Sequence, residues 1–195
     1  MATKRSVFRI AFRIFKWSVL AAYLGLVWAY FSTKGPLTFP VYGVSSTLTP
    51  STFGAPRPGG RKHQGADIFA RRGAAVQSVG WGFVVFAGQD PLGGNVIRVV
   101  GEGGLYTYYA HLDSFAKKVA PGYLVSKGEE IGTVGDTGNA KGTSPHLHFE
   151  TRPLAFFLFP VDPVRLFKGE HPIPGVGKLE MPDPLRLQEK ELPQF

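Results

Sequence analysis

Four of the five histidines lie in the glycine-rich middle of this 195-residue chain, close to other residue types that bind metals. His146 and His148 are two positions apart in a stretch typical of a β-strand, so both imidazoles are expected on one face. His63 and Asp67 offer an imidazole and a carboxylate within one short segment, which we interpret as a loop. Each pattern alone is more often a surface or packing feature. Together with His111 in one small domain, they predict a metal site.

The absence of cysteine narrows the possible chemistry. Disulfides, Cys-ligated zinc, iron–sulfur clusters and thiol nucleophiles are excluded, so a metal must be held by histidine and carboxylate side chains. The chain also lacks a Gly-x-Ser-x-Gly elbow, a Walker phosphate-binding loop and a Gly-x-Gly-x-x-Gly motif after a strand. Serine hydrolase and nucleotide chemistry are therefore excluded.

The elements that must position these side chains are predicted to be short antiparallel strands. Nineteen of the 25 glycines lie between residues 54 and 142, a density that suits tight turns and hardly suits long helices. An all-β domain is therefore the expected fold class. The β-branched and aromatic runs predict strands over residues 75–79, 82–87, 95–100, 105–110, 122–125, 130–134 and 146–150.

The formal charge of +8 is concentrated at one end of the chain. Residues 1–35 hold six basic and no acidic side chains, and the remaining residues hold 16 basic against 14 acidic. This distribution gives no phosphate-binding face, and we expect no nucleic-acid partner. The cations precede the apolar run 17–31, which predicts a helix anchored in the cytoplasmic membrane with the N-terminus inside and the domain in the periplasm or cell-wall space. A cleaved signal peptide, with secretion, is the alternative.

The remaining boundaries follow from composition. We expect the anchor over residues 1–33, a Pro/Ser/Thr-rich linker over 34–50, the β domain over 51–167 and an extended, proline-rich tail over 168–195. Within the domain, the segment 161–167 is expected to close the core. The apolar run 154–160 is interpreted as packing under the sheet, with an exposed lip that touches a membrane or a partner as the alternative.

The motifs resemble those of the LytM/lysostaphin-type zinc metallopeptidases over residues 51–167. The resemblance is carried by His63-x-x-x-Asp67, Tyr109-Ala110-His111-Leu112 and Pro145-His146-Leu147-His148-Phe149-Glu150. Further matches are Ser51-Thr52-Phe53-Gly54, Arg57, Gly65, Gly94-Asn95, the glycine-rich stretch 128–138 and Val161-Asp162-Pro163.

The resemblance implies a barrel-sandwich-like domain with an open groove that hydrolyses peptide cross-links of peptidoglycan. It implies that His63, Asp67 and His148 bind Zn²⁺, and that His111 and His146 act on the reacting water and amide. Two imidazoles and one carboxylate occupy three positions of a four-coordinate zinc ion and leave the fourth for water. Zinc activates this water at neutral pH by lowering its pKa. A protein of the cell-wall machinery is a possible further partner.

Several alternatives stay open at this point. Some relatives in this family have lost ligands and activate cell-wall amidases, so a non-catalytic wall-binding or amidase-activating module is the second hypothesis. A lipoyl-carrier-like domain is a third, disfavoured because it leaves the histidines unexplained. Glu150 is either an orienting partner of a ligand imidazole or a solvent-facing strand residue. Arg61 and Lys62 are interpreted as a solvated loop, with contact to a substrate carboxylate as the alternative.

Overall fold

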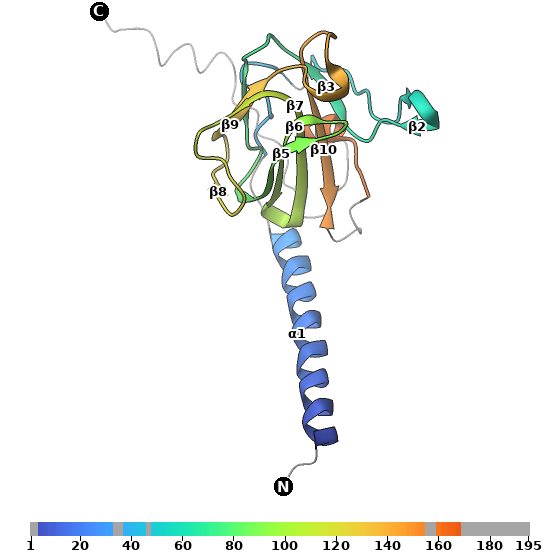
Figure 1. The fold of residues 1–195 in the computed structure, drawn as a ribbon, viewed down its shortest axis with the longest axis vertical. Coiled ribbons are helices and arrows are strands. Elements are labelled where there is room, and N and C mark those ends of the chain that lie inside the picture. The colour runs from blue at the N-terminus through green and yellow to red at the C-terminus, as the bar shows by residue number, and fades with distance from the viewer. Residues whose placement is uncertain (1–3, 33–36, 46–47, 155–158, 169–195) are drawn as a thin grey trace, which may run out of the picture.

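The computed structural model describes residues 4–32, 37–45, 48–154 and 159–168, and it places one long helix beside a β-sheet domain (Figure 1). The helices are α1 (Lys4–Ser32) and α2 (Pro163–Phe167), and the 3-10 turns are η1 (Pro58–Gly60), η2 (Glu102–Gly104) and η3 (Gly138–Ala140). The strands are β1 (Pro56–Arg57), β2 (Arg61–Lys62), β3 (Ala66–Phe69), β4 (Ala75–Gln77), β5 (Gly82–Asp90), β6 (Gly94–Gly101), β7 (Leu105–Phe115), β8 (Leu124–Val125), β9 (Glu130–Val134) and β10 (His146–Pro153). The predicted β-rich domain is confirmed.

Eight of the strands form one sheet in which every pairing is antiparallel. Its main path runs β3-β10-β7-β6-β5-β8, and β9 joins β4 to β7. The remaining strands, β1 and β2, form a separate hairpin that projects from the domain (Figure 1). Each of the seven strands predicted from residue patterns corresponds to one strand between β4 and β10.

Strand β10 places alternate side chains in the core and on the opposite face of the sheet. Leu147 and Phe149 are fully buried, and Phe149 packs against the equally buried Tyr109 of β7, with ring centroids 5.0 Å apart. Because side chains alternate along a strand, His146 and His148 point away from this core. The burial of the two apolar residues therefore fixes the direction in which both imidazoles point.

The described part of the predicted linker is packed onto the domain. Leu37, Phe39 and Val41 belong to the hydrophobic core, and Val41 is 1% exposed. Backbone hydrogen bonds reinforce this packing, since Thr38 donates to the carbonyl of Val79. The domain therefore begins earlier than the predicted boundary at residue 51, because alternate apolar residues in an extended segment can bury one face against a sheet.

The closing segment 161–167 packs on the core as predicted and contains α2. Asp162 caps this helix by accepting hydrogen bonds from the backbone N–H groups of Val164 and Arg165. The same carboxylate accepts a hydrogen bond of 2.7 Å from the Ser51 hydroxyl. Asp162 thereby both caps α2 and connects it to Ser51, 111 positions earlier in the chain.

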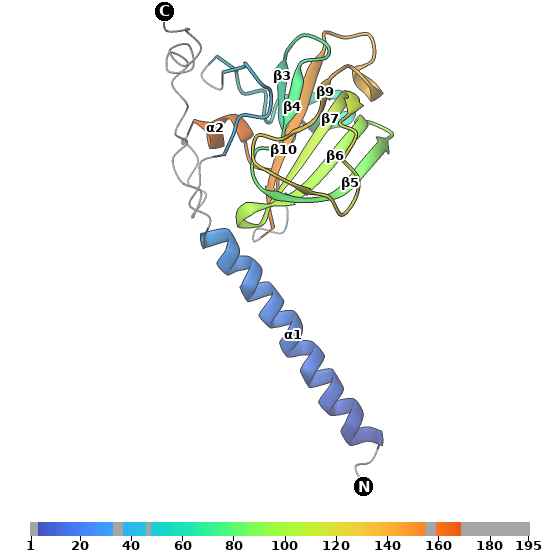
Figure 2. The same cartoon turned by 90° about the vertical axis from the view of Figure 1, so that its left-hand side faces the viewer.

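Helix α1 extends away from the domain (Figure 2). Among the residues whose placement is described, no helix is both long and apolar enough to cross a membrane. The predicted membrane-spanning helix is therefore not supported, because cations occupy its first half and the uncharged run 17–31 is shorter than the roughly 20 residues a span requires.

Two further predictions fall largely outside the described residues. The tail is described only at Lys168, and the apolar run 154–160 lacks residues 155–158. Phe159, at the end of this run, is 69% exposed. The choice between packing and an exposed lip stays open.

Candidate metal centre and its groove

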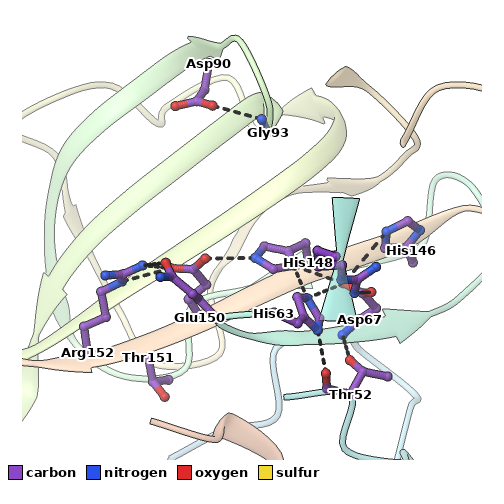
Figure 3. A network of polar contacts seen from close by, with 12 residues as sticks. Thr52, His63, Asp67, Asp90, Gly93, His146, His148, Glu150, Thr151 and Arg152 are labelled. Carbon is purple, nitrogen blue, oxygen red and sulfur yellow. Dashed lines mark hydrogen bonds and ion pairs between the residues drawn. The ribbon is translucent and has the colours of Figure 1, made fainter. Parts of the chain in front are cut away.

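Three predicted ligands meet at one point of the sheet surface (Figure 3). His63 follows the hairpin strand β2, Asp67 lies on β3, and His148 lies directly opposite Asp67 on β10. His63 Nε2 is 2.8 Å from His148 Nδ1, and Asp67 Oδ1 is 3.1 Å and 3.0 Å from these two nitrogens. Tetrahedral ligands about 2.1 Å from an ion are about 3.4 Å apart, so this triangle is close to the required size.

The other ring nitrogens show that lone pairs converge at this point. His63 Nδ1 lies 2.8 Å from the carbonyl oxygen of Thr52, which can only accept, so this nitrogen donates and Nε2 carries a lone pair. His148 Nε2 lies 3.0 Å from a carboxylate oxygen of Glu150, so it donates and leaves the lone pair on Nδ1. Two nitrogen lone pairs and one carboxylate oxygen face each other. A bound cation satisfies all three at once, so the residues fit a metal ion.

Asp67 is held in place through its remaining polar atoms. Arg57 donates to Oδ2, the oxygen that faces away from the histidines, and the Thr52 hydroxyl accepts the Asp67 backbone N–H at 3.0 Å. Burial raises the pKa of Asp67, but the contacts with His148, His63 and Arg57 outweigh it and hold this pKa well below its usual range. The ligand is therefore a carboxylate at neutral pH.

Glu150 orients His148 rather than facing solvent. Its side chain is 11% exposed, and Arg152 donates to Oε2 from both Nε and Nη2, at 2.9 and 2.7 Å. Gln64 accepts a further hydrogen bond from Arg152. Burial lowers the pKa of His148, and contacts with Asp67 and Glu150 outweigh it and raise this pKa, so the site favours a positive charge. Of the two interpretations of Glu150, the structure supports the orienting partner.

His111 and His146 lie beside the three predicted metal ligands. Their ring centroids are 5.1 Å apart, and His111 is 5.9 Å from the ring of His148. His111 Nδ1 donates to the carbonyl of Thr137, and His146 Nδ1 donates to the carbonyl of Ser144, both at 2.8 Å. Each ring therefore keeps Nε2 as a proton acceptor. Burial lowers the pKa of His111 to about 4, so this imidazole is neutral at pH 7.

The backbone at His111 is strained, with a φ of 62° that few non-glycine residues adopt. Thr137, the partner of this ring, is held close by an unusual contact between two glycines. A Cβ on Gly94 would lie 2.3 Å from the backbone nitrogen of Gly138, and the reverse also holds. Because only glycine permits this approach, the turn carrying Thr137 can reach His111.

The structure therefore brings the five predicted site residues together. Sequence reasoning gave no role to the groups that orient them: Thr52, Thr137, Ser144, Arg57 and Arg152. Their signal was present only as matches to family motifs at Thr52, Arg57 and Thr137.

Comparison with models of protein families shows to which family the chain belongs. The model of peptidase family M23 matches residues 61–162, which is more than half of the chain, so the chain belongs to this family. The predicted resemblance is confirmed.

Curated relatives include an L-Ala–D-Glu endopeptidase of Bacillus subtilis, 42% identical over 106 residues, covering 51% of this chain and 32% of the relative. The peptidoglycan DD-endopeptidase ShyB of Vibrio cholerae is 36% identical over 111 residues, covering 57% and 24%. The chain thus spans a third or less of the length of these relatives.

Solved structures give the same fold. Lysostaphin of Staphylococcus simulans has a TM-score of 0.55 and 30% identity, covering 76% of this chain and 61% of that one. A zinc-containing peptidase of Vibrio cholerae has a TM-score of 0.54 and 32% identity, covering 66% and 39%.

Proposed function

We propose that this M23 family member is a zinc-dependent endopeptidase that hydrolyses peptide cross-links of peptidoglycan. The observation that carries the proposal is the convergence of three ligand lone pairs next to two histidines whose Nδ1 atoms are held by backbone carbonyls. The names of the relatives, which include peptidoglycan endopeptidases, support the substrate class.

The chain's own residues divide the chemistry in a simple way. His63, Asp67 and His148 would hold the zinc ion, which would supply a Lewis acid that polarises a peptide carbonyl and lowers the pKa of water. The Nε2 atom of His111 or His146 accepts a proton from the attacking water and returns one to the departing amine. Both rings are fixed by carbonyl acceptors at Nδ1, so either can accept a proton at Nε2 without turning.

Digestion of purified peptidoglycan by the full chain tests this function. With zinc, we expect new amino termini and shorter muropeptides by mass spectrometry, and a chelator should abolish both. The matched control is His146→Ala, which removes a proton acceptor and keeps the three ligands. Absence of cleavage by a zinc-loaded, folded protein would instead favour the non-catalytic wall-binding or amidase-activating module.

We also propose that the domain works outside the cytoplasmic membrane and that α1 holds it at the membrane. The helix exposes large apolar side chains, with Phe12, Phe15 and Trp17 each at least 60% exposed, beside the cations of its first half. Such a helix can bury its aromatic side chains in a membrane while its cations stay at the surface.

Fractionation of cells that express the full chain tests this location. We expect the protein in the membrane pellet, with the domain digested by protease added outside the cytoplasmic membrane. Replacing Phe12, Phe15 and Trp17 with serine should release it. A soluble wild-type protein would contradict the proposal.

A further inference from the structure

The groove at the metal centre is large and carries more cations than acids. Its volume is about 1100 Å³. Five arginine and lysine side chains line it, against three aspartate and glutamate side chains. The cations are Arg57, Arg61, Lys62, Arg98 and Arg152, and the acids are Asp67, Asp90 and Glu150. A bound zinc ion would add to this positive excess.

The three acids are each paired with one of the cations. Arg57 pairs with Asp67, as described above. Arg98 Nη2 lies 2.8 Å from Asp90 Oδ2, and Arg152 Nη2 lies 2.7 Å from Glu150 Oε2. The positive charge of each of these three arginines is therefore balanced by an acid of the protein itself.

Arg61 and Lys62 have no such partner. Within the described ranges, neither forms an ion pair, and Arg61 donates only from Nε, to the carbonyl of Pro58 at 3.3 Å. Both are exposed, and both form strand β2, whose pairing with β1 sets Lys62 opposite Pro56 and Arg61 opposite Arg57. Lys62 directly precedes the metal ligand His63. The backbone ladder thus holds two uncompensated cations at the groove, next to the reacting centre.

We propose that Arg61 and Lys62 bind a carboxylate of an acidic peptide substrate and so select such peptides over neutral ones. Cations that line a groove without an internal acid attract an anionic substrate, and the guanidinium group matches a carboxylate geometrically. The proposal rests on the proposed function and adds that the cross-link is recognised through a free carboxylate. Both side chains act on substrate binding and lie outside the proton-transfer step.

A pair of matched substrates tests this selection. Soluble cross-linked muropeptides are used in native form and after carbodiimide coupling with ammonia, which converts their carboxylates to amides. For the zinc-loaded full chain, we expect kcat/KM to be about tenfold higher for the native form, the ratio that about 1.4 kcal/mol produces. The difference should lie in KM and shrink as salt screens the charges.

The variants separate recognition from a general charge effect. Arg61→Ala/Lys62→Ala should treat both substrates alike through a raised KM, whereas the swap Arg61→Lys/Lys62→Arg should keep the preference. Lys117→Ala/Lys118→Ala removes two neighbouring exposed cations outside the groove lining and should behave as wild type.

Each outcome decides the proposal. Equal cleavage of both substrates by the wild type, or an unchanged preference in the double alanine variant, would overturn it while leaving the endopeptidase function intact. If neither substrate is cleaved, the proposed function fails, and calorimetric binding of the same two muropeptides decides the recognition. Tighter binding of the native form that depends on Arg61 and Lys62 supports the proposal, and equal binding overturns it.

Discussion

The burial and pairing of charged side chains differ between the sheet side of the groove and strand β2 of the β1–β2 hairpin. On the sheet side, Asp67, His148 and Glu150 are nearly buried, and their polar atoms that face away from the metal point have partners. On the hairpin, Arg61 and Lys62 are exposed and lack an acidic partner among the described residues.

This difference separates chemistry from recognition. Buried and fully paired groups hold their positions without the substrate, which reactions at a metal centre require. Exposed cations cost little stability to keep and remain accessible to a charged ligand. Substitutions on the sheet side should therefore change metal binding, kcat or stability, and substitutions of Arg61 and Lys62 should change KM alone.

The largest effect is expected from Asp67→Ala. Removing the only carboxylate ligand leaves two imidazoles for the ion, so we expect loss of bound zinc by elemental analysis and activity at the level of the buffer control. Asp113→Ala, which removes an exposed aspartate paired with Arg72, is the matched control and should keep both. Full zinc occupancy in Asp67→Ala would disprove the assigned ligand set.

Removing a proton acceptor should be the next largest change. His111→Ala and His146→Ala should each lower kcat by about 10²–10⁴-fold, the range of general acid–base catalysis, with zinc content unchanged. The control is His171→Ala, which changes the fifth histidine of the chain, in the expected tail and outside the described residues. A variant that loses its zinc together with its activity would place that histidine among the ligands instead.

A smaller effect is expected when the partner of His148 loses its charge. Glu150→Gln should weaken zinc affinity by about 10–100-fold in a chelator competition assay, because the amide orients the ring less strongly. Glu129→Gln changes a carboxylate that is hydrogen-bonded to Tyr123 outside the groove, and its zinc affinity should equal that of wild type. Equal affinity in both variants would return Glu150 to a surface role.

The smallest effect concerns Asp90, an acid of the groove that is paired with Arg98. The backbone N–H of Gly93 donates a hydrogen bond to Asp90 and lowers the pKa of this carboxyl group below its usual value. The backbone N–H of Leu92 and the positive charge of Arg98 act in the same direction. A depressed pKa stabilises the fold above the unfolded value near 3.8, and this contribution disappears as the pH falls through the folded pKa.

Asp90→Asn should therefore lower the free energy of unfolding at pH 7 by about 0.5–1 kcal/mol, since the group is partly exposed. Denaturant titrations at a series of pH values should show the difference from wild type closing below pH 3.8. A constant difference at every pH would mean that the charge of Asp90 has no part in stability.

The strand pattern of the domain could be predicted because burial repeats every second residue. Leu147 and Phe149 are apolar and His146 and His148 are not, so one short segment specified both its structure and its exposed face. The same logic failed for residues 37–41, where prolines and threonines indicated a tether although Leu37, Phe39 and Val41 alternate toward the core. A short run of alternating apolar residues indicates that a segment packs on a sheet only when the sheet edge or face that it contacts is known.

The sequence by itself determined the metal-ligand types, the likeness to the M23 peptidases and the class of fold, because these depend on residue types at short, regular spacings. Only the tertiary structure decided which ring nitrogen of each of these histidines is held by a partner, since the partners Thr52, Thr137 and Glu150 come from separate segments. It also decided which cations are compensated. Arg57 and Arg61 stand in the same short segment, and only the fold brings an aspartate to one and leaves the other without an acidic partner among the described residues.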